Sequence, residues 1–246
     1  MEVVQRIWRQ ATTVQAPPPP EIVGAIAAVG LILVLVPQLW PVTRLLVTIT
    51  HEGAHALAAW LVGRRLTGIK LNSDTSGVTL SSGKPRGPGM VLMLAVGYLG
   101  PALAGLGAAF LLAAGYSVAL LWMLVVLLSL MLLMIRNFYG LLVLIVAGGA
   151  VFGISWYLSP GWQSAVAYLI TWVLLIAAPK PVIELIRQRS RGEDAGSDVD
   201  QLGRLTLLPG MAWAGLFLLA CLAGLAKGTA VLLPSLIELF RPLFTG

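Results

Sequence analysis

The chain has 246 residues and a mean hydropathy of +0.91, with 58% hydrophobic and 11% charged residues and a single cysteine. Soluble domains carry about 25% charged residues because their surfaces face water, so the composition excludes an ordinary soluble enzyme, a disordered chain and a disulfide scaffold. The net charge of +6 does not indicate nucleic-acid binding, because the basic residues stand in short clusters between apolar stretches, as in the loops of a membrane protein.

The apolar segments predict an all-α polytopic protein of the lipid bilayer, a bundle of about six to eight transmembrane helices. Residues 1–21 form a basic N-terminal segment that ends in the proline-rich spacer Pro17–Pro20. Each following helix is long enough to cross a hydrocarbon core of roughly 30 Å at about 1.5 Å per residue. The expected helices cover about 22–39, 41–62, 90–114, 117–135, 141–158, 162–178 and 207–225.

Two polar stretches interrupt this membrane domain, which extends over residues 22–226. The first, residues 63–87, predicts two short strands joined by a turn at Asn72–Gly77, a β-hairpin-like insertion. The second, residues 179–205, is expected to be a polar loop. The tail, residues 227–246, is too short and too broken by Pro234 and Pro242 to predict another crossing.

The orientation in the membrane is predicted from the basic residues. If every expected helix crosses once, thirteen of the sixteen Lys and Arg residues share one side, and Arg44, Lys227 and Arg241 fall opposite. Cytoplasmic loops collect Lys and Arg, so this side is expected to be the cytoplasm. The prediction places both the N-terminus and residues 63–87 there.

Chemistry concentrates in the second expected helix, where His51, Glu52 and His55 form the motif H-E-x-x-H. Residues four apart project from one face of a helix, so both imidazoles can bind one Zn²⁺ while Glu52 reaches a water on the metal. The carboxylate can then act as a general base. These are the only two histidines of the chain. A charge in the middle of an apolar helix costs roughly 2.5 to 3.5 kcal/mol on insertion scales, which favours a functional role.

The run Thr50–Leu57 within an apolar helix, followed by the polar 63–87 segment, resembles the site-2 protease family of intramembrane zinc metallopeptidases. Further segments resemble a bacterial, actinobacterial-type site-2-like subgroup: Ser73–Gly77, Arg86–Met90, Arg136–Gly140, and Ser197–Asp198 with Leu205, Thr206 and Pro209. The resemblance covers about residues 40–226. It implies that His51 and His55 are zinc ligands, that Glu52 is the general base, and that a membrane-anchored protein substrate is cut in or beside the bacterial plasma membrane.

The third zinc ligand is less evident from the sequence. Better-known members supply it from an L-D-G or similar Asp motif on a later helix, a motif absent here. The chain has four aspartates: Asp74, Asp194, Asp198 and Asp200. Asp198 lies near the start of the last helix on the side predicted for His55, and we expect it to be the ligand, with Asp200 and Asp74 as alternatives. An ordinary N-cap would also explain Asp198.

Two further features invite a functional interpretation. Asn137, at the end of the fourth expected helix, could donate its amide to a substrate carbonyl or oxyanion, although a helix-terminal Asn is equally ordinary. An exposed edge strand in residues 63–87 could bind an extended substrate by strand addition, although a plain loop would explain the same polarity.

The sequence thus predicts a zinc metalloendopeptidase that cuts membrane-anchored proteins. A non-proteolytic zinc-binding or transport protein is the first alternative, but it should carry acids or histidines along several helices, and six of the seven expected helices carry none. An inactive protease-like scaffold is the second alternative. Retention of Glu52 favours catalysis, because metal binding alone does not require it.

Overall fold

A computed structural model of the chain describes residues 1–192 and 196–234. The described part contains ten helices and one two-stranded sheet. Their order is α1 Glu2–Thr12, α2 Pro20–Leu35, α3 Trp40–Leu61, β1 Arg65–Leu71, β2 Gly77–Ser82, α4 Pro88–Ala113, α5 Ser117–Met134, α6 Phe138–Tyr157, α7 Pro160–Ala177, α8 Pro179–Ser190, α9 Asp198–Leu205 and α10 Gly210–Leu232.

The predicted helical membrane fold is confirmed, with fewer crossings than the seven helices drawn from the sequence. Five helices are long and apolar enough to cross a membrane, and α7 with α8 counts as one of them over Pro160–Ser190. A sixth crossing is formed if α2 and α3, which meet at an angle of 99°, are one bent span. With that bent pair counted, the six candidate crossings of the described chain fall at the lower end of the predicted range.

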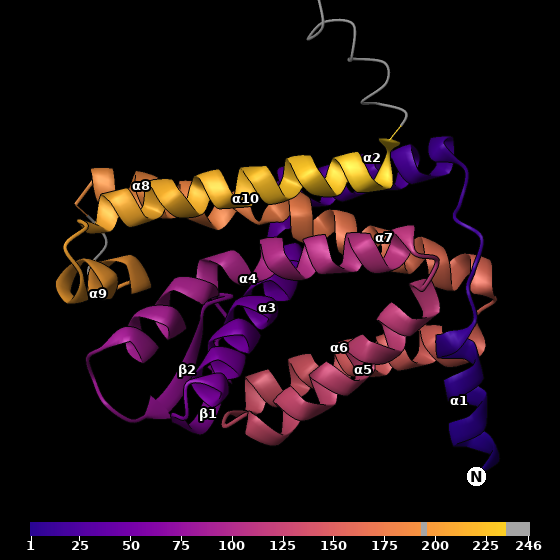
Figure 1. Ribbon diagram of the computed structural model, residues 1–246, viewed down its shortest axis with the longest axis horizontal. Helices are drawn as coiled ribbons and strands as arrows, with labels where there is room; N and C mark the ends of the chain where they lie inside the picture. Colours follow the sequence, from indigo (N-terminus) through magenta and orange to yellow (C-terminus); the bar gives the residue numbers. More distant parts are fainter. Residues whose placement is uncertain (193–195, 235–246) are drawn as a thin grey trace, which may run out of the picture.

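The bend between α2 and α3 bears on the predicted orientation in the membrane. Two separate crossings would return residues 63–87 to the side of the N-terminus. Instead, the N-terminal segment lies at the end of the bundle opposite β1, β2 and α9 (Figure 1). Its backbone is fastened there, because the amide of Gln15 donates to the carbonyl of Gly115 in the α4–α5 turn at 2.8 Å. The structure therefore does not bring residues 1–21 beside residues 63–87, and the side of the membrane that each segment faces stays a prediction.

The predicted hairpin is present as the antiparallel pair β1 and β2, with register from Leu71↔Gly77 to Arg65↔Ser82 and an irregularity after Leu66. The other edge of β1 is covered by the short connection between α5 and α6. There Ile135 forms a parallel bridge with Ile69, and the amide of Arg136 donates to the carbonyl of Ile69 at 2.8 Å. The outer edge of β2 pairs with no strand in the described part of the chain.

The polar stretch 179–205 is not a plain loop, and that expectation is also wrong. It contains α8 and α9, and α8 continues the direction of α7. Both helices are amphipathic: Val182 and Leu185 in α8 and Val199 and Leu202 in α9 are buried in one cluster with Phe217 of α10. Burying these apolar residues stabilises both helices. The mean polarity of residues 179–205 hides their apolar faces, so the sequence predicts a loop.

The core of the bundle lies around α4, which is packed between α3, α7 and α10. Small residues allow this close approach. A methyl group at Gly100 of α4 would meet Cβ of Ala54 in α3 at 2.6 Å, and one at Gly105 would meet Leu175 of α7 at 3.0 Å. Helix α3, which carries the H-E-x-x-H motif, is therefore held directly against the centre of the protein.

Candidate metal centre

Helix α3 presents the motif to the interior. His55 and Glu52 are buried, with 5% and 3% of their surfaces exposed, and His51 is half-buried. Nδ1 of His55 lies 2.7 Å from the carbonyl oxygen of Met93 in α4. Because a carbonyl only accepts, Nδ1 carries the hydrogen and donates it. This contact leaves Nε2 of His55 free to bind a metal, an arrangement common among metal-ligating histidines.

Helix α9 brings Asp198 to the two histidines. Its N-terminus is fixed by a capping box, in which Ser197 is the N-cap and Asp200 the third helical residue. Asp200 also forms an ion pair with Arg189 of α8. Burial raises the pKa of the Asp200 carboxyl, but the bonds from Arg189, Gly196 and Ser197 outweigh it and lower the pKa to about 2. Asp198, in the first turn, is thus held in one direction.

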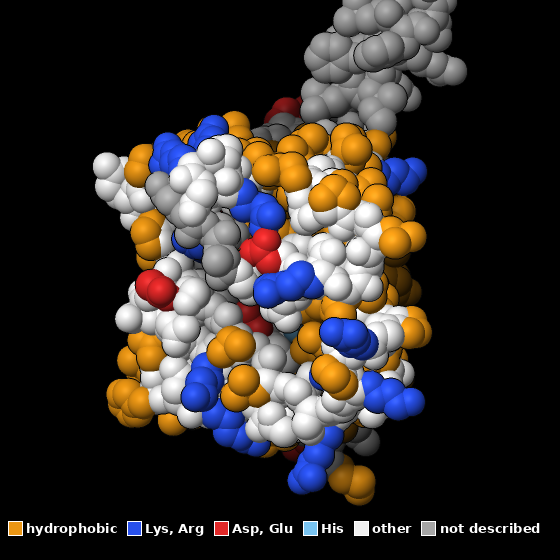
Figure 2. Space-filling view, turned by 90° about the vertical axis from the view of Figure 1, so that its left-hand side faces the viewer, with side chains coloured by type: hydrophobic (Ala, Val, Ile, Leu, Met, Phe, Trp, Pro, Cys, Tyr) orange, Lys and Arg blue, Asp and Glu red, His pale blue; other side chains and the backbone are white. Residues whose placement is uncertain are grey.

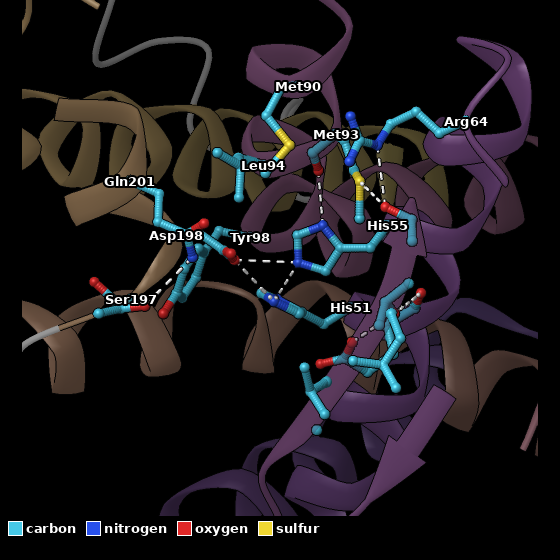
Figure 3. A pocket seen from close by; sticks show the side chains of 17 residues that line it. His51, His55, Arg64, Met90, Met93, Leu94, Tyr98, Ser197, Asp198 and Gln201 are labelled. Atoms are coloured by element: carbon cyan, nitrogen blue, oxygen red, sulfur yellow. Dashed lines mark hydrogen bonds and ion pairs between the residues drawn. The ribbon is translucent and has the colours of Figure 1, made fainter. Parts of the chain in front are cut away.

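The three side chains converge on one point (Figure 3). Oδ2 of Asp198 lies 3.3 Å from Nε2 of His51 and 3.1 Å from Nε2 of His55, and the two Nε2 atoms are 3.0 Å apart. In a tetrahedral site with zinc bonds of about 2.0 to 2.2 Å, ligand atoms are about 3.3 Å apart. The trio therefore matches one face of a zinc tetrahedron and leaves a fourth position open. His51, His55 and Asp198 could hold a metal ion together.

The charge state of Asp198 suits this arrangement. Burial raises the pKa of its carboxyl, but the contacts with His51 and His55 outweigh that effect, so the pKa lies well below its ordinary value. The carboxylate is consequently the stable form, and an anionic oxygen is the form that binds a cation.

Glu52 is attached to the hairpin. The hydroxyl of Thr79 in β2 donates to Oε2 of Glu52 at 2.7 Å, and it also lies 3.1 Å from the backbone carbonyl of Glu52. A methyl group at Gly77 would meet Oε1 of Glu52 at 2.7 Å. Strand β2 therefore lies directly over the carboxylate and fixes its orientation.

A cavity of about 460 Å³ connects these groups. Its walls come from α3, β2, α4 and α9. His51 contacts Tyr98 of α4 edge to face, with ring centroids 4.9 Å apart. The lining residues are His51, Glu52, His55, Arg64, Gly77, Val78, Thr79, Leu80, Ser81, Met90, Met93, Leu94, Tyr98, Gly196, Ser197, Asp198 and Gln201.

The other predicted site residues lie elsewhere. Among the aspartates that the structure describes, Asp198 joins the histidines, whereas Asp200 is engaged with Arg189 and Asp74 is exposed in the hairpin turn, bonded to Ser76. Asp194 lies outside the described residues. Asn137 does not line the cavity.

Asn137 instead joins the hairpin to α6. Its amide nitrogen donates to the carbonyl of Leu71 at 2.6 Å, and its amide oxygen accepts from the amide of Leu71 at 3.2 Å. This two-point contact extends the cover on the outer edge of β1. The expected role toward a substrate carbonyl stays a prediction.

Sequence reasoning missed Thr79 and Arg64, because their closeness to the motif depends on how the hairpin folds back over α3. Gly97 of α4 also belongs to the site, since a methyl group there would lie 2.4 Å from the ring of His55 and 2.8 Å from that of His51. The sequence shows a glycine within an apolar helix, but it does not show which neighbour requires the space.

A family model described as Peptidase M50B-like matches residues 24–228 of the chain. That range includes every residue of the cavity wall. No curated protein matched the chain, and no solved structure did.

Proposed function

The chain belongs to the Peptidase M50B-like family, the site-2 protease family, and from this premise we propose that it is an intramembrane zinc metalloendopeptidase that hydrolyses peptide bonds of membrane-anchored proteins. The observation that carries the proposal is the convergence of His51, His55 and Asp198, with Nε2 and Oδ2 atoms 3.0 to 3.3 Å apart, beside Glu52 in one cavity. An acid that is buried at 3% exposure in an apolar helix is costly without a role.

In the proposed reaction, His51, His55 and Asp198 hold the zinc ion. When bound, zinc supplies Lewis-acid polarisation of the attacking water and of the scissile carbonyl. Glu52 takes a proton from the attacking water and delivers it to the leaving amine, because it stands next to His51 in the sequence and lines the same cavity. Thr79 holds one oxygen of this carboxylate through its hydroxyl.

Strand β2 is the proposed binding site of the substrate peptide. The bond from the amide of Asn72 to the carbonyl of Ser76 sets the hydrogen-bonding alternation of the hairpin. By that alternation, the backbone groups of Gly77, Thr79 and Ser81 point away from β1, toward the open edge. An extended peptide can add there as a third strand, next to Glu52.

We propose that the cavity opens toward the cytoplasm. Figure 2 looks onto the hairpin and α9 end and shows Lys and Arg side chains gathered around it. Since cytoplasmic loops collect basic residues, this end is the cytoplasmic one and the N-terminal segment lies on the other side. The basic residues of the hairpin and its flanking connections, of the α5–α6 connection, of the C-terminal part of α8 and of α9 are Arg64, Arg65, Lys70, Lys84, Arg86, Arg136, Arg187, Arg189, Arg191 and Arg204.

The test compares the native protein with Glu52→Gln in bacterial membranes. Newly formed N-termini are labelled and identified by mass spectrometry, and zinc is measured in the purified proteins. We expect cuts in or beside transmembrane segments with the native protein, a loss of at least about 1,000-fold in Glu52→Gln, and one zinc in both. Glu21→Gln, at an exposed position in the first turn of α2, is the matched control and should cut normally.

Equal cutting by the native protein and Glu52→Gln would refute the proposed function. Zinc bound by both proteins without any cutting would instead support the alternative of a zinc-binding protein without protease activity.

A further inference from the structure

Arg64 lines the cavity but has no part in the proposed chemistry. Arg64 follows α3 and precedes β1, and its side chain is half-buried. In Figure 3 its guanidinium reaches toward Met93, on the wall above His55. It is the one cation among the described residues that line the cavity.

The guanidinium is held in place from two sides. Nε donates to the hydroxyl of Ser81 in β2 at 3.0 Å, and Nη1 donates to the carbonyl of Lys84 at 2.6 Å. These contacts use two of the five N–H groups that an arginine carries. No carboxylate of the described chain lies within 4.0 Å of Arg64, since the four ion pairs found there involve other residues. A fixed charge thus faces the cavity with donors to spare.

The spacing of two residues on β2 shows how far Arg64 lies from Glu52 along a bound peptide. Thr79 contacts Glu52 and Ser81 contacts Arg64, and these two residues lie on the same face of the strand, two positions apart. Two residues of extended chain span about 7 Å. A peptide paired with β2 and cut beside Glu52 would therefore bring a side chain two or three residues from the scissile bond to Arg64.

We propose that Arg64 is a specificity-determining residue that selects substrates with Asp or Glu two or three residues from the scissile bond. This inference rests on the proposed protease function and names the chemistry of its substrate. A carboxylate near the cavity would otherwise be repelled by Glu52 and Asp198. Arginine binds carboxylates in a bidentate, charge-assisted manner, so the remaining donors of Arg64 compensate for that repulsion.

The experiment uses the purified full chain, loaded with zinc in an uncharged detergent, and a proteome-derived peptide library as the probe. Cut sites are read by mass spectrometry for the native protein, Arg64→Gln and Arg64→Glu. We expect about tenfold enrichment of Asp and Glu at one position two or three residues from the native cut, in line with one charge-assisted contact. The preference disappears in Arg64→Gln and shifts to Lys and Arg in Arg64→Glu.

The neighbouring Arg65 provides the matched control, because it is exposed on β1 and does not line the cavity. Arg65→Glu should retain the native preference. Cuts by the native protein without enrichment of acids, or an unchanged preference in both Arg64→Gln and Arg64→Glu, overturn the inference and leave the proposed function standing. Failure of the native protein to cut any peptide, with zinc bound, overturns both.

Discussion

Gly97 of α4 gives the sharpest test of the metal centre. Its α-carbon faces both imidazoles, and the Cβ of an alanine would lie 2.4 Å from Cε1 and Nε2 of His55 and 2.8 Å from Cε1 of His51. Ordinary contacts with a Cβ begin at 3.4 Å, so the ring of His55 would have to move by about 1 Å. The backbone of α4 cannot retreat easily from α3, because α4 is also packed against α7 and α10, and Gly105 already lies against Leu175 of α7.

This displacement is large for a metal site. Zinc ligands keep their distances within about 0.2 Å, and a misplacement of about 1 Å in an active site costs on the order of 100-fold. We therefore expect Gly97→Ala to weaken zinc binding at least 100-fold, which is about 2.7 kcal/mol. The helix itself should not suffer, since alanine favours a helix by about 1 kcal/mol over glycine. Loss of zinc would then reflect the site and not unfolding.

The assay measures zinc by mass spectrometry after dialysis of the detergent-solubilised protein against buffered zinc, together with thermal stability. Gly107→Ala is the matched control, since it lies in the same helix with nothing within 4 Å of the added methyl group. It should bind zinc like the native protein. If Gly97→Ala bound zinc with native affinity, the reasoning that places both imidazoles at one metal against α4 would be refuted.

Three further predictions follow from the same contacts. Thr79→Val removes the hydroxyl that orients Glu52 and should lower kcat about tenfold at unchanged zinc content. The control Thr67→Val, whose hydroxyl bonds only to the carbonyl of Leu80 among described residues, should leave kcat unchanged. Equal kcat in the two variants would contradict the role of Thr79. Asn137→Ala breaks both bonds to Leu71 and should lower the local stability of β1 by about 1 to 2 kcal/mol, which speeds amide hydrogen exchange there. Unchanged exchange with lost cleavage would instead favour the oxyanion role. Cysteines introduced at Thr13 and Ser73 should react with an impermeant maleimide from opposite sides of the membrane, because their segments lie at opposite ends of the bundle. The native Cys221 is buried and should not interfere. Labelling of both cysteines from one side would exclude a bundle with these two segments on opposite sides.

The parts of the site that the sequence predicts well are local. The two histidines and Glu52 lie within five residues of one helix, so the 3.6-residue period alone places them on adjoining faces. Asp198 is 143 positions from His55, yet it could be singled out because a chain with four aspartates offers few choices. The sequence predicts Asp198 near the start of the last helix, whereas the structure places it in the first turn of α9, a separate short helix whose N-cap is Ser197.

The bend between α2 and α3 could not be predicted from hydropathy, which sees two apolar segments of adequate length and no angle between them. The prolines Pro37 and Pro41 mark a break, but a contact from far along the chain secures it. Nζ of Lys180 in α8 donates to the carbonyl of Val34 at 2.5 Å and lies 3.9 Å from the centre of the Trp40 ring. A cation at the end of α2 favours its termination there. Counting apolar segments therefore predicts two separate crossings where the structure has one bent pair of helices.

The hairpin is held on two sides, and this arrangement gives it a function beyond covering the site. Asn137 and Arg136 fix β1 to the start of α6, while Thr79 of β2 holds the carboxylate of Glu52. The outer edge of β2 is thus the part of the sheet still available for pairing. A peptide that adds to this edge would contact the strand that holds Glu52, the proposed general base, through Thr79 and holds Arg64 through Ser81. In the proposed enzyme, one strand would thus couple substrate binding to the alignment of Glu52, so a poorly paired peptide should lose kcat as well as affinity.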